Sequence, residues 1–123
     1  MSKHPIVHVE FSTKDRQTSG KFYSELFGWK VEQMAEMDYA TFESGDGIGG
    51  GFSPIMENNP PGTVLVYVNT DDIQESLRKA ESLGARILTK PEPIPGVGQF
   101  AIFSDQSGNK IGLLQPDMNQ QRI

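Results

Sequence analysis

The residues best suited to chemistry lie close together near the start of the chain. His8 and Glu10 are two positions apart in a segment of alternating polar and apolar residues, so on a β-strand both side chains point to one face. A carboxylate beside an imidazole can hold one histidine tautomer, and the pair can act as a general base near physiological pH. His8 and Glu10 are therefore the candidate catalytic residues.

Each of these residues also has a plain structural interpretation. A single histidine on a strand face is often a half-buried side chain that is hydrogen-bonded within the protein, and Glu10 can equally be a solvated charge. If the pair lines a cavity instead, the imidazole can bind the carbonyl group of a small molecule. The sequence leaves these interpretations open.

A metal site needs three or four N, O or S ligands on converging elements. The chain has no cysteine and two histidines, and His4 lies at the N-terminus, where a solvated side chain is expected. Glu43 and Asp46 are the other carboxylates near enough in sequence to join His8 and Glu10 in an unusual ligand set. We expect no cofactor, with a divalent metal held by atypical ligands as the alternative.

Composition excludes several classes of partner. The net charge is −5, the pI is near 4.9 and there is no Lys/Arg run, so nucleic acid is not expected. No apolar run approaches the roughly 18 residues that span a bilayer, and no membrane partner is expected. The glycine-rich stretch 45–51 lacks the following helix of a phosphate-binding loop. The absence of cysteine and of an apolar N-terminal leader favours the cytoplasm.

The segments that carry the candidate residues occur twice. When residue 7 is placed on residue 63, a pattern of strand, helix and glycine repeats, with Asp15 on Asp71. Further along, residue 39 falls on residue 100, which places Gly51 on Gly112. Two similar halves in the same order indicate an internal duplication.

Each half is predicted to fold as a strand, a helix and three further strands. The expected strands are residues 6–11, 29–34, 39–43 and 49–53, followed in the second half, after a first strand near residue 63, by 85–88, 99–104 and 110–115. The apolar spacing predicts that the first helix, capped by Asp15, buries Phe22, Tyr23, Leu26 and Phe27. The second helix, capped by Asp71, is predicted to bury Ile73, Leu77 and Ala80.

The domain organisation follows from the duplication. We expect a single domain over residues 1–123, with one module at 5–56, a proline-stiffened connector at 57–62, a second module at 63–116 and a frayed tail at 117–123. The Pro- and Gly-rich loop at 91–98 is either a plain connection or a lip over a pocket.

Two βαβββ modules in a chain of this length resemble the vicinal oxygen chelate superfamily, also called the glyoxalase/bleomycin-resistance/dioxygenase fold. The residues that carry the resemblance are "VHVEFSTKDRQTSGKFYSELFGW" and "FSDQSGNKIGLLQP", in which Gln106 stands where the family usually has proline. The resemblance covers residues 5–116. It implies an α+β fold in which the two modules form a cupped mixed sheet with the helices on its outer face.

The resemblance also implies where a metal would be held. In family members with a metal, ligands come from the first and last strands of each module, which places them here at His8, Gly51 (or its neighbour Gly50), Val64 and Gly112. Of these, only His8 can bind a metal, and the glycines leave room for another group to approach the backbone. The implied ligand pocket is lined by His8, Glu10, Gly51, Val64 and Gly112.

Three functions compete. The first, which we predict, is a protein that binds a small molecule in a cup between the modules without a metal, with or without catalysis by His8 and Glu10. The second is a divalent-metal-dependent lyase or dioxygenase with atypical ligands. The third is a non-catalytic interaction module. A homodimer is expected, because sheet edges need covering and many relatives are dimers.

Overall fold

The alternating residues at the start of the chain form strand β1 (Ile6–Thr13), two residues longer than predicted. The structure is a computed structural model that describes residues 4–117. Within that range it has eight β-strands, two α-helices and one short 3-10 helix, which confirms the α+β class. Apart from Asp117, the predicted tail lies outside the described residues. The chain divides into two compact units: a first unit of residues 7–66, and a second unit that joins the segment before Val7 to the chain from Tyr67 onward.

Helix α1 (Arg16–Phe27) begins and ends where the sequence predicts. The Asp15 carboxylate accepts hydrogen bonds from the backbone N–H groups of Gln17 (3.0 Å) and Thr18 (3.3 Å), which have no partner inside the helix. Gly28 ends the helix with φ at 75°, a left-handed conformation that glycine adopts without a steric penalty.

Four strands of the first unit follow the order β2-β3-β4-β1. Strands β2 (Lys30–Met34), β3 (Tyr39–Glu43) and β4 (Gly50–Pro54) pair antiparallel, while β4 pairs parallel with β1. The 3-10 turn η1 (Ala35–Met37) connects β2 to β3. Glu10, Gly51 and Thr41 lie side by side across β1, β4 and β3, and residues in one such row share a face of the sheet.

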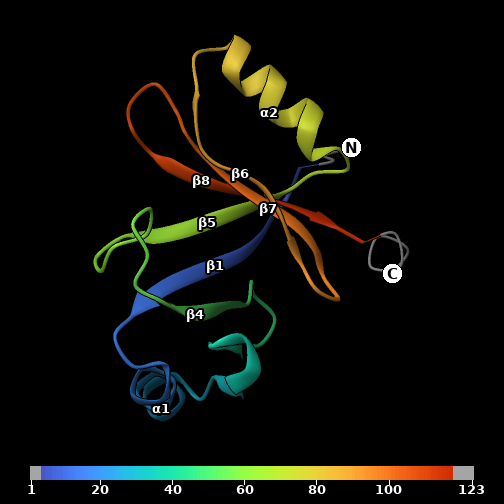
Figure 1. Ribbon diagram of the computed structural model, residues 1–123. Helices are drawn as coiled ribbons and strands as arrows, with labels where there is room; N and C mark the ends of the chain where they lie inside the picture. The colour runs from blue at the N-terminus through green and yellow to red at the C-terminus, as the bar shows by residue number, and fades with distance from the viewer. Residues whose placement is uncertain (1–3, 118–123) are drawn as a thin grey trace. The chain divides into compact units, whose positions relative to one another are not determined.

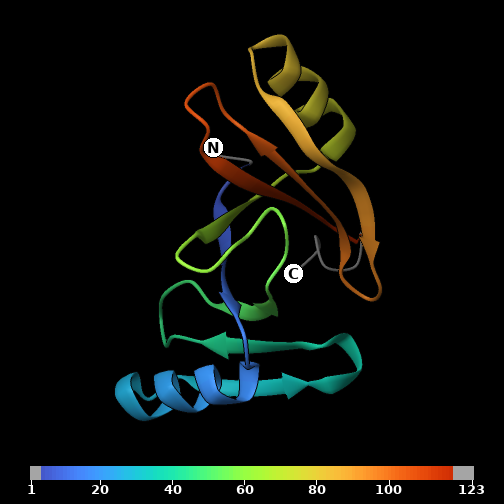
Figure 2. The same ribbon diagram turned by 60° about the vertical axis from the view of Figure 1, so that its left-hand side comes forward.

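The opposite face of this sheet holds an aromatic core. The next row across the same strands contains Phe11, Phe52 and Ala40, of which Phe52 and Ala40 are fully buried. Helix α1 contacts β2, β3 and β4 (Figure 2), and its Tyr23 ring stacks on the rings of Phe11 (5.5 Å between centroids) and Trp29 (5.4 Å). Hence even-numbered residues of β1 turn away from the core.

The predicted buried face of α1 is wrong. Phe22, Leu26 and Phe27 are 56%, 56% and 57% exposed, and of the four predicted side chains Tyr23 alone packs into the core cluster. The buried residue of the helix is Gly20, where an added Cβ would lie 2.9 Å from the Val31 side chain. Because glycine has no side chain, helix α1 can approach the sheet closely at this position, and the contact determines which face of the helix is buried.

The second unit has an aliphatic core. Its strands follow the order β5-β8-β7-β6, where β6 is Arg86–Ile94, β7 is Gly98–Ser104 and β8 is Lys110–Pro116. Strand β5 is Val64–Asn69, and the second unit contains the part of it from Tyr67 onward. Helix α2 (Ile73–Ser82) contacts β6, β7 and β8 (Figure 1). Its Ile73 and Leu77 are buried as predicted, with Ala101 and Leu113 from the sheet, and Ala80 is half-buried.

Two predictions for the second unit are corrected. The capping residue of α2 is Asp72, which accepts from the Glu75 N–H at 3.1 Å, so the repeat of the helix start lies one residue later than Asp71. The segment at 91–98 is largely strand, because β6 continues to Ile94 and a short turn leads into β7 at Gly98. The pairing of β6 with β7 shifts register between Thr89 and Glu92, around Pro91.

Neither described helix is long and apolar enough to cross a membrane.

Candidate functional site

The first unit joins the two predicted catalytic residues through a third residue. The Tyr39 hydroxyl lies 2.7 Å from His8 Nε2 and donates a hydrogen bond to Glu10 Oε1 at 3.0 Å. Since that hydroxyl carries one proton, the arrangement assigns the His8 proton to Nε2, which donates to the Tyr39 oxygen. His8, Tyr39 and Glu10 therefore form a continuous hydrogen-bond chain, which we call the relay.

Strand geometry explains why these three side chains meet. His8 and Glu10 are alternate residues of β1 and share its polar face. Tyr39 starts β3, two residues before Thr41, which lies beside Gly51 and Glu10 in the sheet. The phenol ring crosses β4 over Gly51, and an added Cβ at Gly51 would overlap its hydroxyl end. The room that the sequence predicts at Gly51 is thus filled by the Tyr39 side chain.

Burial moves both ionisable groups toward their neutral forms. Removal from water lowers the pKa of the His8 imidazole. Burial raises the pKa of the Glu10 carboxyl, while the Tyr39 hydrogen bond and the polar side chains of Ser53 and Asn59 lower it by a smaller amount. Displaced pKa values in a half-buried cluster are typical of functional sites, although structural networks also produce them.

Ser53 and Asn59 complete the surroundings of Glu10. Ser53 lies two residues after Gly51 on β4 and is buried. Asn59 lies in the connector and is 2% exposed, and its side chain lowers the pKa of the Glu10 carboxyl. No partner lies within hydrogen-bonding distance of either the nitrogen or the oxygen of the Asn59 amide. No spacing signal in the sequence links Tyr39 or Asn59 to His8, because they come from other elements.

The other predicted pocket residues, Val64 and Gly112, lie on β5 and β8. Val64 begins β5 with its side chain 48% exposed. Gly112 is buried in β8 of the second unit, where an added Cβ would meet the ring of Tyr67. Both glycines that replace implied metal ligands are therefore covered by tyrosine rings, from β3 in the first unit and from β5 in the second.

The residues present do not fit the divalent metal that the resemblance implies. Gly51 and Gly112 have no ligand atoms, Val64 has an apolar side chain, and His8 Nε2 already bonds Tyr39. Within residues 4–117 no group of three or more His, Cys, Asp or Glu side chains is arranged to hold a metal ion. We therefore derive no chemistry through a metal at these positions.

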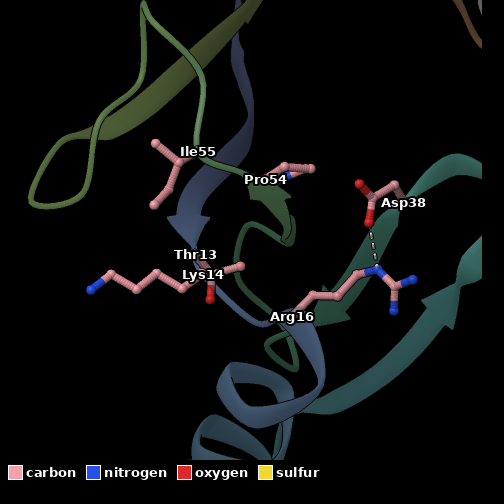
Figure 3. A pocket seen from close by; sticks show the side chains of 6 residues that line it. All are labelled: Thr13, Lys14, Arg16, Asp38, Pro54 and Ile55. Carbon is pink, nitrogen blue, oxygen red and sulfur yellow. Dashed lines mark ion pairs between the residues drawn. The ribbon is translucent and has the colours of Figure 1, made fainter.

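A hollow of about 350 Å³ opens at the far end of β1. Figure 3 shows the residues that line it: Thr13, Lys14, Arg16, Asp38, Pro54 and Ile55. The Lys14 and Arg16 side chains extend in opposite directions, and Arg16 is held by Gln33 Oε1 (2.7 Å) and Asp38 Oδ1 (3.4 Å). Because the Arg16 charge is compensated within the chain, the hollow is a weak candidate for an anion site.

Comparisons with known proteins place the chain in a family. The family model described as Glyoxalase/Bleomycin resistance protein/Dioxygenase superfamily matches residues 5–113. The chain is 32% identical over 119 residues to "Putative glyoxylase CFP32" of Mycobacterium tuberculosis, covering 94% of this chain and 45% of that protein. It thus spans about half the length of the curated relatives it matches first.

Solved structures show the same fold at low sequence identity. A hypothetical protein from Bacillus halodurans, BH1468, superimposes with a TM-score of 0.72 at 14% identity, covering 94% of this chain and 96% of that one. A methylmalonyl-CoA epimerase from Mycobacterium tuberculosis gives 0.70 at 14% identity, covering 96% and 91%. Together with the family match, these likenesses confirm the resemblance drawn from the sequence. The chain belongs to the glyoxalase/bleomycin resistance protein/dioxygenase superfamily.

Proposed function

We propose that the chain binds a small molecule at the polar face of the first unit, around His8, Tyr39 and Glu10, without a bound metal. The observation that carries this proposal is the relay, in which one tyrosine hydroxyl joins an imidazole and a carboxyl on a half-buried sheet face. A core position would be filled more stably by apolar side chains, since burying polar groups opposes folding unless they are paired. A half-buried cluster of ionisable groups with displaced pKa values is typical of a ligand-binding site.

The relay also supports proton transfer as a possible extension of binding. A neutral imidazole can take a proton from a bound carbonyl compound at Nδ1 and release its Nε2 proton to the Tyr39 oxygen, while the Tyr39 hydroxyl proton passes to the ionised Glu10 carboxylate. Burial favours the neutral imidazole that a base requires. His8 and Glu10 are thus proposed as base and final acceptor, and Tyr39 as the group between them.

Nuclear magnetic resonance tests the binding proposal. The ¹⁵N-labelled protein is titrated with cyclopentanone, γ-butyrolactone, 2-pyrrolidinone and acetate. At least one compound is expected to shift the amide signals of His8, Glu10 and Tyr39, and Tyr39→Phe is expected to weaken its binding by about threefold or more, the loss of one modest hydrogen bond. Tyr23→Phe is the matched control, since it removes a hydroxyl from the aromatic core instead. If no compound shifts those signals, the proposal is wrong.

Metal analysis tests the other half of the proposal. Protein purified without chelators is expected to contain no stoichiometric divalent metal, because three of the four implied ligand positions lack ligand atoms. Zinc, nickel, manganese or iron near one equivalent, lost in His8→Ala, would favour the metal-dependent lyase or dioxygenase instead.

A homodimer and a cytoplasmic location complete the proposal. The exposed Phe22, Leu26 and Phe27 of α1 form an apolar surface that a second copy can cover. Sedimentation equilibrium is expected to give a dimer, and Phe22→Glu a monomer. A monomeric parent protein contradicts this part. The absence of cysteine supports the location.

A further inference from the structure

Aspartate or asparagine is followed by glycine once in the sequence, at Asp46 and Gly47. The pair lies in the loop between β3 and β4, and both residues are exposed. Because glycine has no Cβ, its backbone nitrogen is unshielded, and the chain beside it can rotate through conformations that other residues avoid. The Gly47 nitrogen is therefore accessible to the side-chain carboxyl carbon of the residue before it.

The tip of this loop is open. The Ser44 hydroxyl donates a hydrogen bond to the Ile48 carbonyl at 2.7 Å, which closes the base of the loop. A Cβ added at Gly47 would meet only the Ser44 Oγ, at 3.3 Å, and one added at Gly45 would meet no atom within 4 Å. In the described part of the chain, no hydrogen bond or ion pair engages the Asp46 carboxylate. That carboxylate can therefore turn toward the Gly47 nitrogen.

The corresponding loop of the second unit is held by hydrogen bonds. The internal repeat places Gly47 on Gly108, between β7 and β8. The Gly108 N–H donates to the Asp105 carbonyl at 3.0 Å. The Asp105 carboxylate accepts from the backbone N–H groups of Ser107 and Asn109, both at 2.9 Å. Among the described residues, the Gly47 N–H makes no comparable hydrogen bond. The glycine nitrogen is thus fixed in one loop and accessible in the other.

We propose that Asp46 is a site of isoaspartate formation, through a cyclic imide with the Gly47 nitrogen. That nitrogen bonds to the side-chain carbonyl carbon of Asp46, whose hydroxyl group leaves with the amide proton as water. A second water then opens the ring. When it breaks the bond from the nitrogen to the main-chain carbonyl carbon, the chain continues through the side chain and an α-carboxylate is freed. One water leaves and one enters, and nothing is oxidised or reduced. The modification does not depend on ligand binding by the first unit.

Isotope uptake and methylation test this inference. The protein is incubated at neutral pH and physiological temperature in water enriched in ¹⁸O, and its peptides are analysed by mass spectrometry. Samples are also treated with S-adenosylmethionine and an isoaspartyl methyltransferase, which methylates the freed α-carboxylate. The Asp46 peptide is expected to gain both labels about tenfold faster than the Asp105 peptide, whose carboxylate is held by hydrogen bonds. If the Asp46 peptide gains neither label, the inference is wrong.

Substitutions in the loop test the role of the glycine. Gly47→Val is expected to slow labelling of the Asp46 peptide about tenfold, because a β-branched side chain crowds the reacting nitrogen. Ile48→Val, a change in the same loop that leaves the reacting pair intact, is expected to keep the parent rate. If Gly47→Val folds poorly, Asp46→Glu replaces it, since its longer side chain must close a larger ring and is expected to react more slowly. Labelling at the parent rate in these variants overturns the inference.

Ser107→Asp separates the effect of the loop from that of the residue pair. It places an aspartate before Gly108 in the second unit, where the glycine N–H is hydrogen-bonded. Because that bond must break before the nitrogen reacts, the new aspartate is expected to form isoaspartate about fivefold more slowly than Asp46 in the same protein. Equal rates at the two loops would contradict the role assigned to the open tip.

Discussion

The two units share an order of elements but differ in what they bury. The first packs aromatic rings against α1 and turns His8, Glu10 and Tyr39 to the opposite face, whereas the second packs Ile73, Leu77, Ala101 and Leu113 around α2. The large apolar side chains of helix α2 are buried, whereas three apolar side chains of helix α1 are exposed. After duplication, one copy thus keeps an ordinary core while the other can accumulate polar and exposed groups that serve binding.

The largest contrast is expected between the two helices. Leu77→Ala on α2 should lower the free energy of unfolding by about 3 kcal/mol, because the side chain is fully packed. Leu26→Ala on α1 should change it by less than about 0.5 kcal/mol in the monomer. Urea unfolding at low protein concentration measures both. Similar losses would mean that the exposed face of α1 is covered in solution.

The covered glycines give the next contrast. Gly112→Ala should lower the free energy of unfolding by about 2 kcal/mol, since the buried Tyr67 ring cannot move aside. Gly51→Ala should lower it by about 1 kcal/mol, because the half-buried Tyr39 can swing outward, but it should break the relay and ligand binding with it. Gly47→Ala, which meets only the Ser44 hydroxyl at 3.3 Å, is the control. A larger loss of unfolding free energy in Gly51→Ala than in Gly112→Ala would contradict this expectation.

The helix starts give a smaller contrast. Thr13 Oγ1 bonds Ser19 Oγ (2.5 Å) in the first unit, and Thr70 Oγ1 bonds Ser76 Oγ (2.7 Å) in the second. Thr70→Val should lower the free energy of unfolding by about 1.5 kcal/mol and Thr13→Val by about 1 kcal/mol, because Thr70 is fully buried whereas Thr13 is half-buried. Thermal unfolding of the two variants measures both losses. Equal losses would mean that the burial of the threonine does not determine the strength of this hydrogen bond.

The smallest expected effect is the pH dependence that the first unit adds. The lowered His8 pKa means that the unfolded chain binds a proton near pH 6.5 before the folded protein does, so its stability falls as pH drops below 6.5. The raised Glu10 pKa acts oppositely, and stability falls as pH rises from 4.5 through the raised value. In a plot of unfolding free energy against pH, His8→Gln should reduce the loss of stability below pH 6.5. Glu10→Gln should reduce the loss of stability as pH rises from 4.5. Unchanged slopes would mean that the relay exchanges no protons on unfolding.

Local patterns predicted the elements well. Strand β3 occupies the predicted residues 39–43, and Asp15 and Gly28 delimit α1 as expected, because capping and alternation depend on neighbours in sequence. The choice between Asp71 and Asp72 could not be made in this way, since either carboxylate can cap a helix that starts next to it.

The errors arise where distant segments decide. The apolar residues of α1 lie on more than one face, and the contact of Gly20 with Val31 chooses which face is buried. His8 and Glu10 were found from their spacing, whereas Tyr39 and Asn59 reach them only through strand pairing and the connector. Their roles depend on register across the sheet, which one sequence does not display.

The prolines of β6 also bear on how the protein avoids forming fibres. Among the described strands β6 is last in its order and pairs with β7 alone. Pro91 and Pro93 remove two backbone donors from this strand, and the register shift beside Pro91 bends it. An incoming strand would find an interrupted row of hydrogen-bonding groups, so the edge is a poor template for cross-β aggregation.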